Sequence, residues 1–327
     1  MIRRVSAAQL FFVTGKGGVG KTTVAAALAQ QLAAARRRVL LVETAADRSL
    51  ASLFGAQPLS GEPVQLAARL SGVRVETRAL VESYFRRLLR LPFLARRLFA
   101  SGTFQAVTAA APGVTEFVIL DHLLQWTEPS RMTRRAAFDA VIVDGPASGH
   151  AVRLLRTPRQ LARLVPRGPI GTSIGRLQAL LEDRTRTRVV IVAIPDEMAV
   201  AEALETRAAI SGLNVALAPA VLNRVWPRRF TAAEEQALDK RSAATRSRRQ
   251  DGAGARDDAP REPLLLAARL SIAARHEAER HLVALQRAFG AVPIALTEQA
   301  GRAVDATVLT SFGRALATAA GDNGDAR

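Results

Sequence analysis

Two of the three lysines in this 327-residue chain, Lys16 and Lys21, lie five residues apart in one glycine-rich segment. Apart from Lys240, every other residue among the 46 Lys and Arg is an arginine. A compact ammonium group on a flexible stem differs from a planar guanidinium, so a chain that otherwise uses arginine has a chemical reason for lysine here. The segment 15–23 reads GKGGVGKTT and matches the phosphate-binding pattern G-x-x-x-x-G-K-[ST]. It therefore predicts a site for a nucleoside triphosphate.

Each part of this loop has an expected role. Its glycines let backbone N–H groups face phosphate oxygens, and the start of the following helix adds positive potential. Lys21 would bridge the β- and γ-phosphates, and the Thr22 hydroxyl would bind Mg²⁺. The loop residues predicted to bind ATP are Gly15, Gly17, Gly18, Val19, Gly20, Lys21, Thr22 and Thr23.

The flanking sequence fits such a loop, because an apolar run at 10–13 precedes it and an alanine-rich helical stretch at 23–35 follows it. Short apolar runs then alternate with helical stretches, which is typical of a parallel sheet with crossover helices. The other predicted strands are 39–42, 73–76, 140–143, 189–194, 220–222 and 292–296. The expected fold is α/β, a three-layer P-loop NTPase with a mostly parallel sheet flanked by helices.

We expect one ATPase domain over residues 1–320, with two segments that depart from the alternating pattern. Residues 79–135 lack strand signals and carry two apolar groups, so they predict an inserted helical subdomain. Residues 228–262 are polar and charged with glycines, and they predict a mobile loop.

The formal net charge of +17 makes nucleic acid, anionic lipid or an acidic protein conceivable partners. We favour arginines spread over solvated helix faces instead, since aromatic residues make up only 5% of the chain and leave little for base stacking. The absence of cysteine excludes thiolate zinc or arsenite sites and disulfides. No apolar run is long enough to span a membrane, so we expect a cytoplasmic protein.

The second lysine, Lys16, gives the loop a form that resembles the deviant Walker A ATPases. The segment DGPASGH at 144–150, followed by Arg153, is similar to the second switch of the arsenite-pump and tail-anchored-protein-targeting branch. This resemblance implies that Asp144 holds Mg²⁺ through water and that Gly149 offers an N–H to the γ-phosphate. It further implies that Asn223 reads adenine and that Lys16 acts across a homodimer on the neighbouring site. The implied catalytic residues are Lys16, Lys21 and Asp144.

The chain also departs from that family. In that family, the first switch normally has an aspartate at the position where this sequence has Ala45. Glu43 or Asp47 would have to replace it, yet a shift of two residues along an extended chain moves a carboxylate about 6–7 Å.

Three functions stay open at this point. The favoured one is an ATP-driven homodimer that couples its nucleotide state to a hydrophobic client or a membrane partner, with residues 79–135 forming the client region. The second is a positioning ATPase of the ParA or MinD kind that acts on DNA or membrane. The third is a nucleotide sensor that does not hydrolyse ATP, as Ala45 suggests.

Overall fold

The computed structural model describes residues 9–44, 50–89, 113–129, 136–250, 262–299 and 303–318. Its centre is an eight-stranded sheet with the order β3-β4-β2-β5-β1-β6-β7-β8. The strands are β1 (Leu10–Gly15), β2 (Val39–Glu43), β3 (Val64–Ala67), β4 (Leu70–Arg74), β5 (Ala140–Ala147), β6 (Thr187–Ala193), β7 (Val221–Val225) and β8 (Ile294–Thr297). Neighbouring strands are parallel, except that β3 and β4 form an antiparallel pair.

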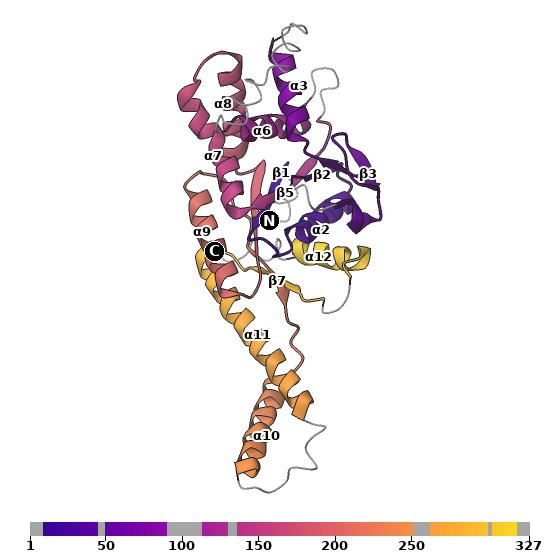
Figure 1. The fold of residues 1–327 in the computed structure, drawn as a ribbon, viewed down its shortest axis with the longest axis vertical. Coiled ribbons are helices and arrows are strands. Elements are labelled where there is room, and N and C mark those ends of the chain that lie inside the picture. The colour runs from indigo at the N-terminus through magenta and orange to yellow at the C-terminus, as the bar shows by residue number, and fades with distance from the viewer. Residues whose placement is uncertain are drawn as a thin grey trace.

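Helices cover both faces of this sheet (Figure 1). One face carries α2 (Lys21–Ala34), the short 3₁₀ helix η1 (Leu50–Phe54) and α12 (Ala306–Thr318). The other face carries α3 (Thr77–Leu89), α6 (Val114–Thr127), α7 (Ser148–Leu164), α8 (Gly168–Glu182), α9 (Glu197–Ser211) and α11 (Glu262–Phe289). The predicted three-layer α/β fold with a mostly parallel sheet is confirmed.

The central strands are apolar on both sides because helices bury both sides. In β1, Phe11 packs into the core under α2, whereas Phe12 packs into the core of the opposite face, and both are at most 2% exposed. Continuous apolar runs of this kind are what a parallel sheet requires. Each predicted strand overlaps an observed one, but the ends shift by up to four residues, and the predicted strand 73–76 shares only residues 73 and 74 with β4.

The edge strand β3 was not predicted from the sequence. Its four residues, VQLA, are largely exposed, so they lack the apolar run that identifies the central strands. A tight turn joins β3 to β4, and Arg69 in that turn has a left-handed φ of 62°. A short hairpin is sufficient here because antiparallel neighbours, unlike parallel ones, can be joined without a crossover helix.

The loop predicted for residues 228–262 is wrong over most of its length, because α10 (Ala232–Gln250) occupies it. Thr231 caps this helix: its N–H donates to Glu234 Oε2 at 2.7 Å, and Glu234 N–H lies 3.4 Å from Thr231 Oγ1. This is a capping box, and the Thr-x-x-Glu spacing in the sequence was a usable signal for it. Figure 1 shows α10 and α11 as a hairpin that projects away from the sheet. Residues 251–261 lie outside the described residues.

The expected helical insertion at 79–135 is represented by α3 and α6, since residues 90–112 and 130–135 lie outside the described part. The two helices pack together, and the rings of Tyr84 and Phe117 meet edge to face at 5.3 Å. Val81, Leu120 and Leu123 are also buried in the core of this face. These five residues therefore serve ordinary packing onto the sheet.

Among the described helices, none combines the length and the apolar character needed to cross a bilayer.

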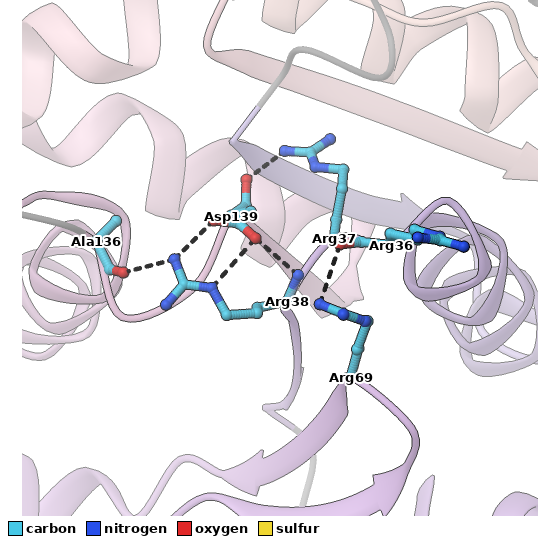
Figure 2. A network of polar contacts seen from close by, with 6 residues as sticks. All are labelled: Arg36, Arg37, Arg38, Arg69, Ala136 and Asp139. Carbon is cyan, nitrogen blue, oxygen red and sulfur yellow. Dashed lines mark hydrogen bonds and ion pairs between the residues drawn. The ribbon is translucent and has the colours of Figure 1, made fainter.

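An arginine-rich corner joins β2 to β5 at the amino ends of these strands (Figure 2). Arg38 Nη2 donates to Asp139 Oδ1 at 2.7 Å, and the Arg38 backbone N–H donates to Asp139 Oδ2 at 2.8 Å. Arg38 also reaches the Ala136 carbonyl at 3.0 Å, and Arg37 donates to the Asp139 carbonyl. The hydrogen bonds from the Arg38 side chain, with those from its backbone, hold the pKa of Asp139 below its ordinary value. Through Arg38, Asp139 thus holds the first residues of β2 and β5 side by side.

We expect Asp139→Asn to lower the free energy of unfolding by about 1 kcal/mol at pH 7, because the pair is partly exposed but also anchors a backbone N–H. A depressed folded pKa means that the carboxylate stabilises the fold above its unfolded pKa of about 3.9 and loses this contribution as pH falls through the folded pKa. Urea unfolding of wild type and variant should therefore differ at pH 7 and 5, and the difference should shrink as the pH falls below about 3.9.

Asp239→Asn, on an exposed position of α10, provides the matched control and should change little at any pH. A difference between wild type and Asp139→Asn that persisted undiminished at pH 3 would contradict this account.

Candidate functional site

The glycine-rich loop begins where β1 ends, between its neighbours β5 and β6. Gly15 has φ 149°, and a Cβ there would lie 2.1 Å from the Val192 carbonyl oxygen. Gly20 has φ 90°, and a Cβ there would lie 2.3 Å from Asn223 Nδ2. Glycine is thus required at both ends of the loop by close contact as well as by backbone conformation.

The middle of the loop is open. Gly17 and Gly18 are exposed, and a Cβ at either would meet no atom within 4 Å. Between them and α2, Val19 is fully buried and anchors the loop in the core under α2. The loop therefore has a fixed base and an accessible backbone above it, which is the shape of a phosphate cradle.

The two lysines of the loop are in contact through the backbone. Lys21, the first residue of α2, is 8% exposed, and its Nζ donates to the Lys16 carbonyl oxygen at 3.1 Å. The Lys16 side chain is half-buried. The Lys16 carbonyl oxygen thus holds the ammonium group of Lys21 at the loop, and a phosphate oxygen could accept the same hydrogen bond.

Two oxygen donors that are far apart in the sequence meet beside the loop. Thr22 Oγ1, in the first turn of α2, donates to Asp144 Oδ2 at 2.8 Å. Asp144 lies in β5, is 4% exposed, and pairs in register with Val13 of β1. A hydroxyl and a carboxylate oxygen are ligands that Mg²⁺ accepts, directly or through water. Together with the glycine cradle, this donor set fits a Mg²⁺-bound triphosphate. Thr23, the remaining predicted loop residue, is half-buried in the same turn.

Asn223, in β7, contacts the backbone of the loop at Val19. It is 6% exposed, and its Nδ2 donates to the Val19 carbonyl oxygen at 2.9 Å. The structure therefore shows a contact that braces the loop, which sequence reasoning missed. A contact of Asn223 with adenine stays a prediction.

Glu43, one of the two carboxylates proposed to replace the missing aspartate, has both oxygens engaged. It is fully buried at the end of β2, where Oε1 accepts from the Leu50 backbone N–H at 2.7 Å and Oε2 accepts from Arg74 Nε at 2.8 Å. The next residue, Thr44, donates its Oγ1 to the Asp144 carbonyl at 2.7 Å. Glu43 thus joins β2, β4 and η1. Ala45 and Asp47 lie outside the described residues.

The second predicted switch begins at the end of β5. A Cβ at Gly145 would lie 2.6 Å from the Val13 carbonyl oxygen, so β5 needs glycine to pass β1 closely. Ser148, the first residue of α7, donates to Glu202 of α9, whereas Gly149 has open space around it. His150 is exposed, and its Nδ1 lies 2.8 Å from Arg153 Nη2. These contacts assign His150 to the surface of α7.

Residues 8–168 match the family model described as anion-transporting ATPase. Through this segment, the chain belongs to the ArsA ATPase family. ATPase BagA of Mycobacterium tuberculosis is 28% identical over 229 residues, which cover 68% of this chain and 67% of that protein. The arsenical pump-driving ATPase of Escherichia coli is 30% identical over 258 residues, covering 73% of this chain but 42% of that relative. ATPase get3 of Schizosaccharomyces japonicus is 30% identical over 155 residues, covering 46% of this chain and 44% of that protein.

The ArsA family match covers the loop, Thr22 and Asp144, and it ends before Asn223. Homology thus supports ATPase activity at the family level.

We expect Gly15→Ala to destabilise the protein by about 3 kcal/mol or more, because a methyl group 2.1 Å from Val192 O forces β1 or β6 to move. Gly17→Ala is the matched control in the same loop and should stay within about 0.5 kcal/mol of wild type, since no atom is near. Thermal and urea unfolding measure both. Equal stability of the two variants would contradict the close approach of Gly15 to β6.

We expect Glu43→Gln to lower the free energy of unfolding by about 2–3 kcal/mol, because it leaves the half-buried Arg74 without its countercharge. The double variant with Arg74→Gln should cost less than the two single variants together, as in a directly coupled pair. Arg78→Gln, which breaks an exposed pair with Glu82, should cost under about 0.5 kcal/mol. Unchanged stability of Glu43→Gln, with ATP turnover abolished, would instead assign Glu43 to the chemistry.

Proposed function

We propose that this chain is an ATP-hydrolysing switch of the ArsA type that requires Mg²⁺ and works as a homodimer. The observation that carries the proposal is the hydrogen bond between Thr22 and Asp144 beside an open glycine cradle. That arrangement brings a hydroxyl, a carboxylate, a lysine and the exposed backbone of Gly17 and Gly18 to one end of β1. A site of this composition suits phosphoryl transfer, in which positioning and charge stabilisation do most of the work.

In this proposal Lys21 binds the phosphates, and Thr22 and Asp144 bind the metal ion. Lys21 exchanges its contact with the Lys16 carbonyl for phosphate oxygens, while Thr22 and Asp144 hold Mg²⁺. Bound Mg²⁺ supplies neutralisation of the charge that develops on the phosphate oxygens. The exposed backbone at Gly17 and Gly18 would offer N–H donors to the same oxygens, so that negative charge would be met from the backbone as well as from Lys21.

Within a single subunit, the Lys16 side chain has no evident role in binding the phosphates. In the proposed homodimer, its ammonium group reaches the phosphates of the facing subunit and stabilises the transition state, as an arginine finger does.

Activation of the attacking water falls to Asp47 in this proposal, because both oxygens of Glu43 are engaged with Leu50 and Arg74. Glu43 instead joins the end of β2 to the start of η1 through the Leu50 N–H. A chain in which Asp47 does not take this role would bind ATP without turnover, which is the sensor alternative.

We further propose that nucleotide state is passed to a hydrophobic client or a membrane partner through the region 79–135. Thr44 contacts the Asp144 carbonyl, and Ser148 contacts Glu202, so both segments beside the loop are tied to the sheet or its helices. In α3 and α6, Val81, Tyr84, Phe117 and Leu120 are buried in packing, and residues 90–112 of the proposed client region lie outside the described residues.

The test is the release of inorganic phosphate from MgATP by wild type, Lys21→Ala and Lys16→Ala, with Lys240→Ala as a control that removes the remaining lysine from exposed α10. Both loop variants should lose turnover by at least about a hundredfold, whereas Lys240→Ala should match wild type.

Mixing the two inactive variants tests the homodimer. A subunit with Lys16→Ala keeps its own Lys21 and would receive Lys16 from a partner with Lys21→Ala, so activity should return to about a quarter of wild type if subunits exchange at random. Lost turnover without recovery on mixing would assign Lys16 to its own subunit. Tight MgATP binding by wild type without turnover would favour the sensor.

A further inference from the structure

A cavity open to solvent lies at the opposite end of the sheet from the nucleotide loop. Its volume is about 320 Å³, and it is formed where the turn before β6, the last turns of α9 and the end of α11 meet. Its lining includes Arg184, Arg207, Ser211, Asn214, Leu217 and Phe289. Its volume is in the range of sites for small ligands.

Position separates this cavity from the proposed ATP site. In β6 the first residue, Thr187, pairs with Leu10 at the start of β1, whereas Val192 near its end lies against Gly15. The seven residues of β6 span roughly 20 Å. A group bound beside Arg184 is therefore distinct from one bound at the loop.

The cavity carries uncompensated positive charge. Arg184 and Arg207 both line it, and within the described part of the chain neither has a carboxylate at ion-pair distance. The acidic residue next in sequence, Asp183, uses its Oδ1 to accept from the N–H and hydroxyl of Thr185, at 2.8 and 2.6 Å. Two guanidinium groups without such a partner favour an anion with several oxygens.

The other lining groups define what the anion is attached to. Ser211 and Asn214 add polar side chains, and Asn214 has a left-handed φ of 60° that places it at the tight turn after α9. Leu217 and the ring of Phe289 add apolar surface, and the Arg207 guanidinium lies 5.8 Å from the centre of that ring. Such a mixture of charged, polar and aromatic groups is typical of sites for small organic anions.

We propose that this cavity binds a small organic phosphate, with the phosphate group between Arg184 and Arg207 and a planar or apolar group against Phe289 and Leu217. A dianionic phosphate matches two guanidinium groups better than a single carboxylate does, because each can donate two hydrogen bonds to its oxygens.

Calorimetric titration of the full chain with phenyl phosphate tests this site, with inorganic phosphate and benzoate as competitors. All titrations contain saturating MgADP, so that the nucleotide loop takes no part. Arg184→Gln and Arg207→Gln should each weaken phenyl phosphate binding at least tenfold. Arg229→Gln, which removes an equal charge from an exposed position outside the cavity, should leave it unchanged.

Phe289→Leu should weaken phenyl phosphate but not inorganic phosphate, which separates a local contact from a general loss of folding; thermal unfolding of each variant checks the latter. No binding by wild type, or binding equally weakened by Arg229→Gln, would overturn the proposal. Benzoate binding as tightly as phenyl phosphate would overturn the choice of a phosphate, and displacement of phenyl phosphate by a short oligonucleotide at equal concentration would overturn the choice of a small ligand. None of these outcomes depends on ATP turnover.

Discussion

The hydrogen bond between Thr22 and Asp144 joins residues that are 122 positions apart, and it exists only because β1 and β5 lie side by side in parallel register. Parallel neighbours end at the same edge of the sheet, so the loop after β1 and the carboxylate at the end of β5 meet there. Other contacts at this edge of the sheet keep Asp144 beside the loop. Gly145 lets β5 pass the Val13 carbonyl, and Thr44 holds the Asp144 backbone from the other side.

Burial of charge is the second constraint on this edge. Glu43 is fully buried directly beside Asp144 in the β2–β5 pairing, and two carboxylates so close in a core require separate compensation. Arg74 and the Leu50 N–H compensate Glu43, while Thr22 donates to Asp144. This division explains why Glu43 belongs to the scaffold although its residue type and position suggested chemistry.

The sequence was sufficient to predict the layered fold, the loop and its Thr22, because these depend on local patterns of a few residues. The cap of α10 was equally local, and the prediction failed there because charge and glycine content outweighed the Thr-x-x-Glu signal. Strand β3 could not be recognised, since an exposed edge strand carries no apolar run. The engagement of Glu43 depends on Arg74, 31 residues away, and the bond from Asn223 to Val19 spans 204 positions. Such pairs follow from strand order, which no local pattern contains.

The scarcity of lysine has a consequence for covalent regulation. Acetylation and other acylations act on amines and remove their charge. Among the side chains of this protein, only Lys16, Lys21 and Lys240 could accept them, and Lys21 is shielded by its burial and its contact with the Lys16 carbonyl. Any acyl group added to a side chain would therefore fall on the nucleotide loop or on the projecting helix α10, and the arginine-covered remainder of the surface would keep its charge.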